Sequence, residues 1–276
     1  MGTDLQFDRI GYWSEIKLEI LKEYASAYST ILAAQSSPSL YHVYIEGFAG
    51  AGVHIARATN EFVLGSPLNA LNVEPPFREY YLIDIQPERV ESLKNLIGAR
   101  SDVHIYPGNC NEILLDRVFP RVRYEDYRRG LCILDPYGLD LTWSVISQAG
   151  QMKTMDLFLN FPVEAINRNV LWRNPDKVLP SHVNRMTAFW GDSNWPALLY
   201  KQGGLFNWPE KESNEAVAQA FRERLQKVAG FQRVPEPLPM RNSNGAIIYY
   251  LFFASQKDTA ERIVLDIFNK YRNRGG

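Results

Sequence analysis

Two short motifs hold the residue types best suited to chemistry, and the first is rich in glycine. It spans Glu46 to Gly52 (EGFAGAG) and has glycines in the pattern G-x-x-G-x-G. Glycines let the backbone approach a ligand closely and present N–H groups to an anion or polar group where a helix begins. Alternatively, they simply make a tight turn between a strand and a helix. A nicotinamide dinucleotide site is a minor alternative, because its pattern is G-x-G-x-x-G with an acid ~20 positions later, whereas Asp84 lies 32 residues beyond Gly52.

The second motif is Asp135-Pro136-Tyr137-Gly138. The Asp135 carboxylate and the Pro136 carbonyl accept hydrogen bonds, so together they can hold the N–H groups of an amine. The Tyr137 ring can stack on a planar group. The alternative is that Asp-Pro only ends a strand.

The elements that must position these motifs alternate along the chain. Apolar residues recur at helical spacing from Ser14 to Ala34, which predicts a helix with Ser14 as its N-cap. Five apolar segments predict strands. All of them except the third end in a polar residue that is followed by Gly or Pro. They span residues 41–46, 80–85, 103–106, 131–135 and 156–160. Residues 54–62, after the glycine turn, favour a helix. This order is typical of an open parallel α/β sheet with a ligand site at its carboxyl edge.

The C-terminal part ends differently. Residues 231–240 and 246–254 flank Asn244-Gly245, a strong hairpin signal, so the last two strands should be antiparallel. A final helix is expected over Asp258 to Tyr271. We therefore divide the chain into an N-terminal helical segment (1–40), a core (41–162 and 231–276) and a mostly helical insertion or cap (163–230).

These elements resemble the class I S-adenosylmethionine-dependent methyltransferases. The resemblance implies an α/β Rossmann-like fold: a seven-stranded, mostly parallel sheet with an antiparallel last strand, helices on both faces, and a helical insertion. It also implies a cofactor site in which an acid after the second strand holds the ribose and a polar residue after the third lies near the adenine. The corresponding positions here are Glu46, Gly47, Phe48, Gly50, Gly52, Asp84, Asn109 and Cys110. The long gap between Gly52 and Asp84 departs from the family pattern.

The second motif is similar to the D/N-P-P-Y/F motif of amino-group methyltransferases, and closer still to the D-P-F-G of tRNA guanine dimethyltransferases. The resemblance implies catalytic roles for Asp135, Pro136 and Tyr137. An exocyclic amine conjugated to a ring or carbonyl is a poor nucleophile, so acceptors that orient its N–H groups direct the nitrogen toward the sulfonium methyl. One proline stands here instead of two.

Over nearly its full length the chain resembles the three-Cys-motif partner (TcmP) family. The matching segments are YWSEIKLEILKEYASAYSTIL, YIEGFAGAG, GSPLNAL, ILDPYGL and FLNFP. This resemblance implies a separate partner protein with a three-cysteine motif, and it leaves the substrate open. We expect S-adenosylmethionine as the cofactor and an amino nitrogen, most simply of a DNA or RNA base, as the methyl acceptor. The alternative is a partner or regulatory module that binds the cofactor without chemistry.

Basic and aromatic residues follow the fifth expected strand and favour contact with a nucleic-acid strand through phosphate contacts and stacking. The candidate substrate contacts are Asn160, Arg168, Asn169, Trp172 and Arg173. The alternative is a solvated charged face over core aromatics. The formal net charge of −1 provides no overall attraction to nucleic acid, so a basic surface would have to be local.

The composition of the chain excludes several classes of protein. With 46% hydrophobic and 22% charged residues, the chain is that of an ordinary globular protein. Two cysteines without CxxC spacing and four scattered histidines predict neither a disulfide framework nor a metal site. The N-terminal residues lack a signal-peptide pattern and no apolar run approaches ~20 residues. We expect a cytoplasmic protein without membrane contact.

Overall fold

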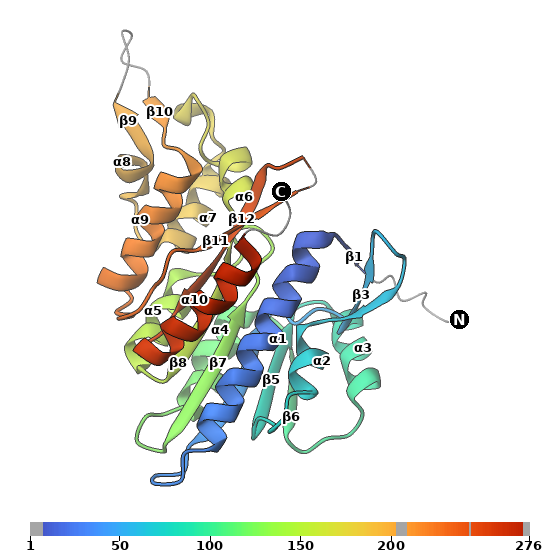
Figure 1. Ribbon diagram of the computed structural model, residues 1–276. Helices are drawn as coiled ribbons and strands as arrows, with labels where there is room; N and C mark the ends of the chain where they lie inside the picture. Colours follow the sequence, from blue (N-terminus) through green and yellow to red (C-terminus); the bar gives the residue numbers. More distant parts are fainter. Residues whose placement is uncertain (1–7, 203–208, 243, 273–276) are drawn as a thin grey trace.

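A seven-stranded sheet lies at the centre of the computed structural model, which describes residues 8–202, 209–242 and 244–272. The strand order is β11-β12-β8-β7-β2-β5-β6 (Figure 1). All neighbouring pairs from β8 to β6 are parallel, whereas β12 runs antiparallel to both β8 and β11. The strands are β2 (Tyr41–Gly47), β5 (Glu79–Asp84), β6 (Val103–Pro107), β7 (Arg128–Leu134), β8 (Met155–Phe161), β11 (Leu238–Arg241) and β12 (Ile247–Ala254). The prediction of a mostly parallel seven-stranded sheet with an antiparallel last strand is confirmed.

Helices cover both faces of this sheet because its central strands bury side chains on both sides. In β2, for example, Val43 and Ile45 belong to one hydrophobic cluster and Tyr44 to the other. One face carries α1 (Tyr12–Ala33), α2 (Ser66–Leu71), α3 (Pro87–Ile97) and α10 (Asp258–Arg272). The other carries α4 (Cys110–Ile113) with the turns Leu114–Val118 and Phe119–Arg121, α5 (Trp143–Met152), α6 (Val163–Asn169), α7 (Pro180–Trp190), α8 (Trp195–Leu199) and α9 (Asn214–Lys227). In Figure 1, α1 and α10 lie side by side across the sheet.

The helix α1 begins earlier than expected. Gly11 is its N-cap, and the Ser14 N–H donates to the Gly11 carbonyl at 2.9 Å, so the prediction of Ser14 as the N-cap is wrong. Trp13 packs against the core cluster on this face. The apolar pattern begins at Ile16, but this tertiary contact extends the helix by one turn toward the N-terminus.

The segment after the glycine turn is also different from the prediction. Residues 54–62 do not form a helix. A hairpin of β3 (Val53–Ala56) and β4 (Phe62–Leu64) stands there, and β3 also pairs in parallel with β1 (Arg9–Ile10). Asn60 has a positive φ of 59°, which suits a turn. Helix propensity is weak compared with the pairing that β1 provides from a distant part of the chain.

The hairpin returns the chain to the glycine turn before α2 begins. The Gly65 N–H donates to the Gly52 carbonyl at 2.8 Å, and α2 starts at Ser66. A Cβ at Gly65 would lie 2.9 Å from the Gly52 oxygen, so this approach requires glycine. The hairpin and α2 account for the long gap between Gly52 and Asp84.

The insertion between β8 and β11 contains α6 to α9, the turn Pro175–Lys177 and a small antiparallel pair, β9 (Tyr200–Gln202) with β10 (Pro209–Lys211). Its aromatic residues join the core of the sheet: the Phe221 ring lies 4.6 Å from the Phe161 ring, centroid to centroid. The insertion therefore packs on the sheet as part of one hydrophobic core. Within the described ranges, no helix has the length and apolar character needed to cross a membrane.

Candidate functional site

The polar residues predicted at the strand ends meet at the carboxyl edge of the sheet. Glu46 lies near the end of β2, Asp84 ends β5, Asp135 directly follows β7 and Asn160 lies near the end of β8. Since these strands are parallel, their ends share one edge. Two adjoining cavities open there, and Phe48 lies in the lining of both.

We name these cavities by the strands beside them. The β5–β6 cavity has a volume of about 200 Å³ and is lined by Asp84, Arg89, Asn109 and Cys110, among others. The β7–β8 cavity has a volume of about 480 Å³ and is lined by Lys17, Glu46, Ser66, Asp135, Asn160 and Arg168, among others. Phe48 and Tyr137 line both, so the two cavities are neighbours along the same edge.

In the β5–β6 cavity, the backbone holds the Asp84 carboxylate in place. One oxygen accepts from the Gly50 N–H at 2.8 Å and the other from the Gln86 N–H at 2.9 Å. The Ala49 N–H donates to the Ile83 carbonyl. The expectation that the turn presents these N–H groups to a ligand is therefore wrong for Ala49 and Gly50. A carboxylate has about four acceptor positions, so Asp84 retains capacity for hydroxyl donors.

The glycine-turn residues divide into two groups. Phe48 and Gly50 line a cavity, and Phe48 has a φ of 72°, a conformation that costs roughly 1–3 kcal/mol for a residue with a side chain. Gly47 and Gly52 do not line either cavity. A Cβ at Gly47 would lie 3.1 Å from a Leu134 methyl, so a larger residue there would have to displace that side chain by a few tenths of an ångström. Gly52 has a φ of 85° and shapes the turn.

Asn109 and Cys110 lie at the start of α4, beside Asp84. The Asn109 side chain accepts from the Asn111 N–H at 3.0 Å and so caps the helix. Burial raises the pKa of the Cys110 thiol to about 12, so it is neither a thiolate nor a nucleophile near neutral pH. Sequence reasoning missed Asn111, whose side-chain amide donates to the Asp140 carbonyl at 2.8 Å and ties the loop after β7 to α4.

The β7–β8 cavity is built around Asp135. One of its oxygens forms an ion pair with Lys17, and the other accepts from the Asn160 side-chain amide at 2.7 Å. The remaining Asn160 atom, Oδ1, is buried and has no hydrogen-bond partner among the described residues. The amide orientation follows from the acceptor at Asp135. The pair therefore presents an unused acceptor beside a carboxylate.

Lys17 is the main residue that sequence reasoning missed. Its side chain is only 13% exposed, and its ammonium lies 5.6 Å from the Tyr249 ring centroid. Burial alone would lower the pKa of Lys17, but the Asp135 carboxylate reverses this and raises it above the ordinary value. The sequence contains a signal for the burial of Lys17, because this residue lies seven positions before Tyr24 and therefore on the same side of the helix as apolar residues.

Glu46 lies in the same cavity and is 2% exposed. The Tyr44 hydroxyl donates to one of its oxygens at 2.8 Å and the Ser66 hydroxyl to the other at 2.5 Å. Burial raises the pKa of Glu46 to about 8, against the opposing effect of these hydrogen bonds. The group is therefore largely protonated at neutral pH, and a cationic ligand group would favour its ionised form.

Tyr137 is held between the two cavities by Arg89. The Arg89 guanidinium donates to the Tyr137 hydroxyl at 2.6 Å, and its centre lies 5.1 Å from the ring centroid. The same guanidinium pairs with Asp8 at 2.8 Å and lies 4.0 Å from Asp84. Arg89, which sequence reasoning also missed, thus connects the second motif to Asp84 at the end of β5.

The predicted substrate contacts are only partly brought together. Asn160 and Arg168 line the β7–β8 cavity. Asn169, Trp172 and Arg173 are not among its lining residues. The Trp172 indole donates to the Arg168 carbonyl at 2.6 Å, so it supports the chain that carries Arg168.

Comparisons with known proteins concern the fold. No family model matches the chain, and no curated protein matches it, so membership of the TcmP family stays a prediction. A solved protein from Legionella pneumophila str. Philadelphia 1, of the family-model DUF519, is similar over 94% of each chain with a TM-score of 0.50 and 13% identity. A carbon methyltransferase, CurJ, matches over 86% of this chain and 54% of its own, with a TM-score of 0.44 and 12% identity. The first likeness shows a shared α/β fold, and the second is too weak to support an argument.

Proposed function

We propose that this protein is an S-adenosylmethionine-dependent methyltransferase that acts on an amino nitrogen of a nucleobase. The observation that carries the proposal is the pair formed by Asp135 and Asn160, which holds a carboxylate next to an unused buried acceptor in a cavity. An amino group has two N–H donors, and this pair offers acceptors for both. The neighbouring β5–β6 cavity supports the proposal because the Asp84 carboxylate and the Asn109 side chain suit the hydrogen-bonding groups of an adenosine.

The residues at this edge fit the cofactor by their chemistry. Asp84 has acceptor capacity for the ribose hydroxyls, Phe48 and Ile85 offer apolar surface to an adenine, and Glu46 can balance an ammonium group. When bound, S-adenosylmethionine supplies an electrophilic methyl group on a positively charged sulfur. The sheet adds support, since β12 inserts antiparallel between β8 and β11 as the methyltransferase resemblance implies.

Lys17 has a defined part in this proposal. Its ammonium forms an ion pair with one oxygen of the Asp135 carboxylate and fixes the orientation of that group, which accepts hydrogen bonds. With the amine N–H groups held by Asp135 and by Asn160 Oδ1, the nitrogen lone pair is free to face the methyl group. Asp135 can then accept the proton that the methylated nitrogen must lose.

A nucleobase is the acceptor class that the rim of the cavity supports. The Tyr137 ring is 55% exposed there, and the exposed Arg168 lines the same cavity. Stacking on an aromatic ring is worth ~1–3 kcal/mol per base, and an arginine provides a phosphate contact. A single-stranded substrate avoids the cost of flipping a base out of a duplex.

The test separates cofactor binding from transfer. Calorimetric titration with S-adenosylmethionine measures the first, and transfer of a labelled methyl group to single-stranded RNA and DNA measures the second. We expect Asp84→Asn to weaken cofactor binding about tenfold or more through the loss of charged hydrogen bonds to hydroxyls. We expect Asp135→Ala to reduce transfer by about a hundredfold or more while the cofactor dissociation constant changes only a few-fold.

The matched control is Asp116→Asn, which removes an exposed carboxylate outside both cavities. It should change neither the affinity for the cofactor nor the rate of methyl transfer. Absence of cofactor binding by the unaltered protein would contradict the whole proposal. Full transfer activity in Asp135→Ala would contradict the role of the second motif.

A second candidate function is a cofactor-binding module without catalysis that acts beside a three-Cys-motif protein. One observation favours it: Asp135 is already paired with Lys17, and the Tyr137 hydroxyl already accepts from Arg89. Saturable cofactor binding without transfer to any nucleic acid, together with complex formation with a co-expressed three-Cys-motif protein, would support this alternative.

A further inference from the structure

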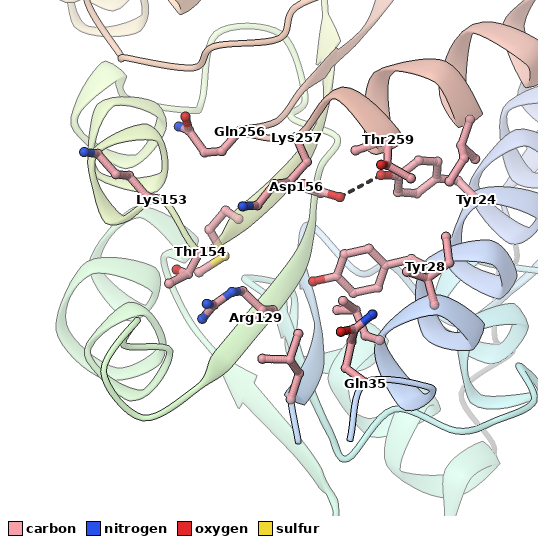
Figure 2. Close-up of a pocket in the computed structure, with 16 residues that line it drawn as sticks. Tyr24, Tyr28, Gln35, Arg129, Lys153, Thr154, Asp156, Gln256, Lys257 and Thr259 are labelled. Carbon is pink, nitrogen blue, oxygen red and sulfur yellow. Dashed lines mark hydrogen bonds between the residues drawn. The ribbon is translucent and has the colours of Figure 1, made fainter. Parts of the chain in front are cut away.

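A third cavity lies at the opposite edge of the sheet, where β7 and β8 begin. Its volume is about 330 Å³, and Figure 2 shows its residues. The β7 and β8 strands contribute its floor, the C-terminal half of α1 one wall, and the start of α10 another. We call it the amino-edge cavity and define it by Tyr24, Tyr28, Arg129, Thr154, Asp156 and Lys257.

This cavity is separate from the candidate active site. Arg129 is the second residue of β7, and Asp135 follows six residues later, beyond the end of the strand. At ~3.3 Å per residue the two positions are ~20 Å apart. No lining residue is shared between this cavity and either cavity at the carboxyl edge.

The charges of the amino-edge cavity are mainly positive. Arg129, Lys153 and Lys257 line it, and none of the three forms an ion pair with a described residue. The single carboxylate, Asp156, has other partners, as the next paragraph describes. In Figure 2 the Lys153 ammonium points away from Asp156. The Arg129 guanidinium lies 4.2 Å from the Tyr124 ring centroid and donates to the Arg128 carbonyl at 2.7 Å, and neither contact neutralises its charge. An anion placed near Arg129 and Lys257 would therefore be stabilised.

Asp156 is held by two hydroxyl groups. The Tyr24 hydroxyl donates to one oxygen at 2.6 Å, and the Ser255 hydroxyl donates to the other at 2.5 Å. Each oxygen thus accepts from one neutral donor, and the Lys257 ammonium opposes the rise that burial causes in the pKa of Asp156. Asp156 therefore fixes Tyr24 against the sheet and compensates only part of the positive charge.

The cavity also has polar groups without partners. The Thr154 hydroxyl is buried and makes no hydrogen bond within the described ranges, and Thr154 is 3% exposed. In Figure 2 the Tyr28 hydroxyl points from α1 toward the side where Arg129 and Lys257 lie. A buried hydroxyl without a partner costs free energy, so the arrangement is suited to a ligand that supplies acceptors.

Most of the remaining lining is apolar, although Gln35, Gln256 and Thr259 also line the cavity. The rings of Tyr24 and Tyr28 and the aliphatic side chains of Leu32, Leu40 and Ile263 form the walls. Ligand sites are typically ~300–1,000 Å³, mostly apolar, and carry a few convergent polar groups. The amino-edge cavity has this combination.

We propose that the amino-edge cavity binds a small organic anion, with a carboxylate or phosphate group among Arg129, Lys257 and the Thr154 hydroxyl and an apolar body against Leu32, Leu40 and Ile263. The basic groups recognise the charge, and the aliphatic side chains provide an apolar surface. This proposal is independent of the methyltransferase proposal, because it uses no residue of the carboxyl edge.

Three probes of related shape test the proposal on the full-length protein. They are 4-phenylbutyrate, phenyl phosphate and the neutral 4-phenylbutanol, each titrated by saturation-transfer NMR and by calorimetry. We expect saturable binding of at least one anion and much weaker binding of the alcohol. The two anions distinguish a carboxylate site from a phosphate site.

Two variants and a control locate the binding. Lys257→Gln should weaken binding of the anion about fivefold to tenfold by removing a charged contact. Thr259→Trp, at an exposed lining position of α10, should block entry. Lys94→Gln, at an exposed position of α3 outside the cavity, removes the same charge and should leave binding unchanged.

The outcomes that overturn the proposal are definite. Equal binding of the alcohol and the anions would show that charge plays no part. Equal weakening in Lys257→Gln and Lys94→Gln would show non-specific attraction. Absence of saturable binding of both anions at millimolar concentration would show that the cavity is not an anion site. Cofactor binding is measured in the same samples, so failure here and failure of the methyltransferase proposal are distinguishable.

Discussion

The two edges of the central sheet differ in charge although the same helix borders both. At the carboxyl edge, acids outnumber basic residues in the lining of the two cavities. The acids are Asp8, Glu46, Asp84, Asp135, Asp140 and Glu164, and the basic residues are Arg9, Lys17, Arg89 and Arg168. At the amino edge, basic residues outnumber the single acid, Asp156. One sheet can therefore present a site suited to a cationic group at one edge and a site suited to an anion at the other.

Helix α1 connects these regions because of its length. Its 22 residues extend ~33 Å, enough to pass along the strands from one edge to the other. Lys17 reaches the carboxyl edge, whereas Tyr24 and Tyr28, seven and eleven residues later, reach the amino edge. These spacings repeat on one face of a helix. The same amphipathic face thus serves both cavities.

The largest effect is expected from breaking the charge pair at the carboxyl edge. Asp135→Leu leaves the Lys17 ammonium, which is 13% exposed, without its partner, and should lower the free energy of unfolding by about 3 kcal/mol. Urea unfolding measures this. The double variant Lys17→Met/Asp135→Leu should recover most of the loss, and failure to recover it would mean that the two residues contribute independently.

A second prediction concerns Glu46 and pH. Its pKa is about 8 in the folded protein against an ordinary value of 4.5, so the folded state binds more protons between these values. Stability should therefore fall as pH rises from 4.5 to 8, and Glu46→Gln should remove that part of the fall. Between pH 6 and pH 8 we expect the variant to gain on the order of 2 kcal/mol relative to the unaltered protein. Parallel pH profiles of the two proteins in urea unfolding would contradict this account.

A third prediction concerns Arg89, which links Tyr137 to Asp84. Arg89→Met should destabilise the protein by about 1 kcal/mol, since it removes a hydrogen bond and a cation–π contact. Thermal unfolding measures the change. Arg100→Met, which removes a more exposed guanidinium stacked near Tyr80, is the matched control and should cost less.

The smallest effect is expected at the amino edge and sharpens the contrast in charge. Asp156→Asn removes the only carboxylate of that cavity while keeping an acceptor for the Tyr24 hydroxyl. Binding of the anionic probe should tighten by about threefold, opposite in direction to the loss expected when an acid is removed at the carboxyl edge. Weaker binding in this variant would mean that Asp156 positions the ligand rather than repels it.

Much of the sheet could be predicted from local patterns in the sequence. Apolar segments ending in Asp84 and Asp135 placed both acids at strand ends, and Asn244-Gly245 indicated the antiparallel finish. The hairpin after Gly52 was missed because residues 54–62 have mixed propensity, and their pairing partner, Arg9–Ile10, is more than forty residues away. Local pattern cannot reveal a partner at that separation.

Residue types and their order by themselves determined that the acids and the second motif lie at the ends of parallel strands, because hydrophobic periodicity and strand polarity are local properties. Tertiary structure alone decided that Lys17 pairs with Asp135, that Gly50 donates to Asp84, and that three basic residues gather at the opposite edge. The physical reason is that the burial and the charged neighbours of a side chain depend on which distant segments pack together. Burial and charged neighbours in turn set the pKa of Glu46 and the sign of the charge that lines each cavity.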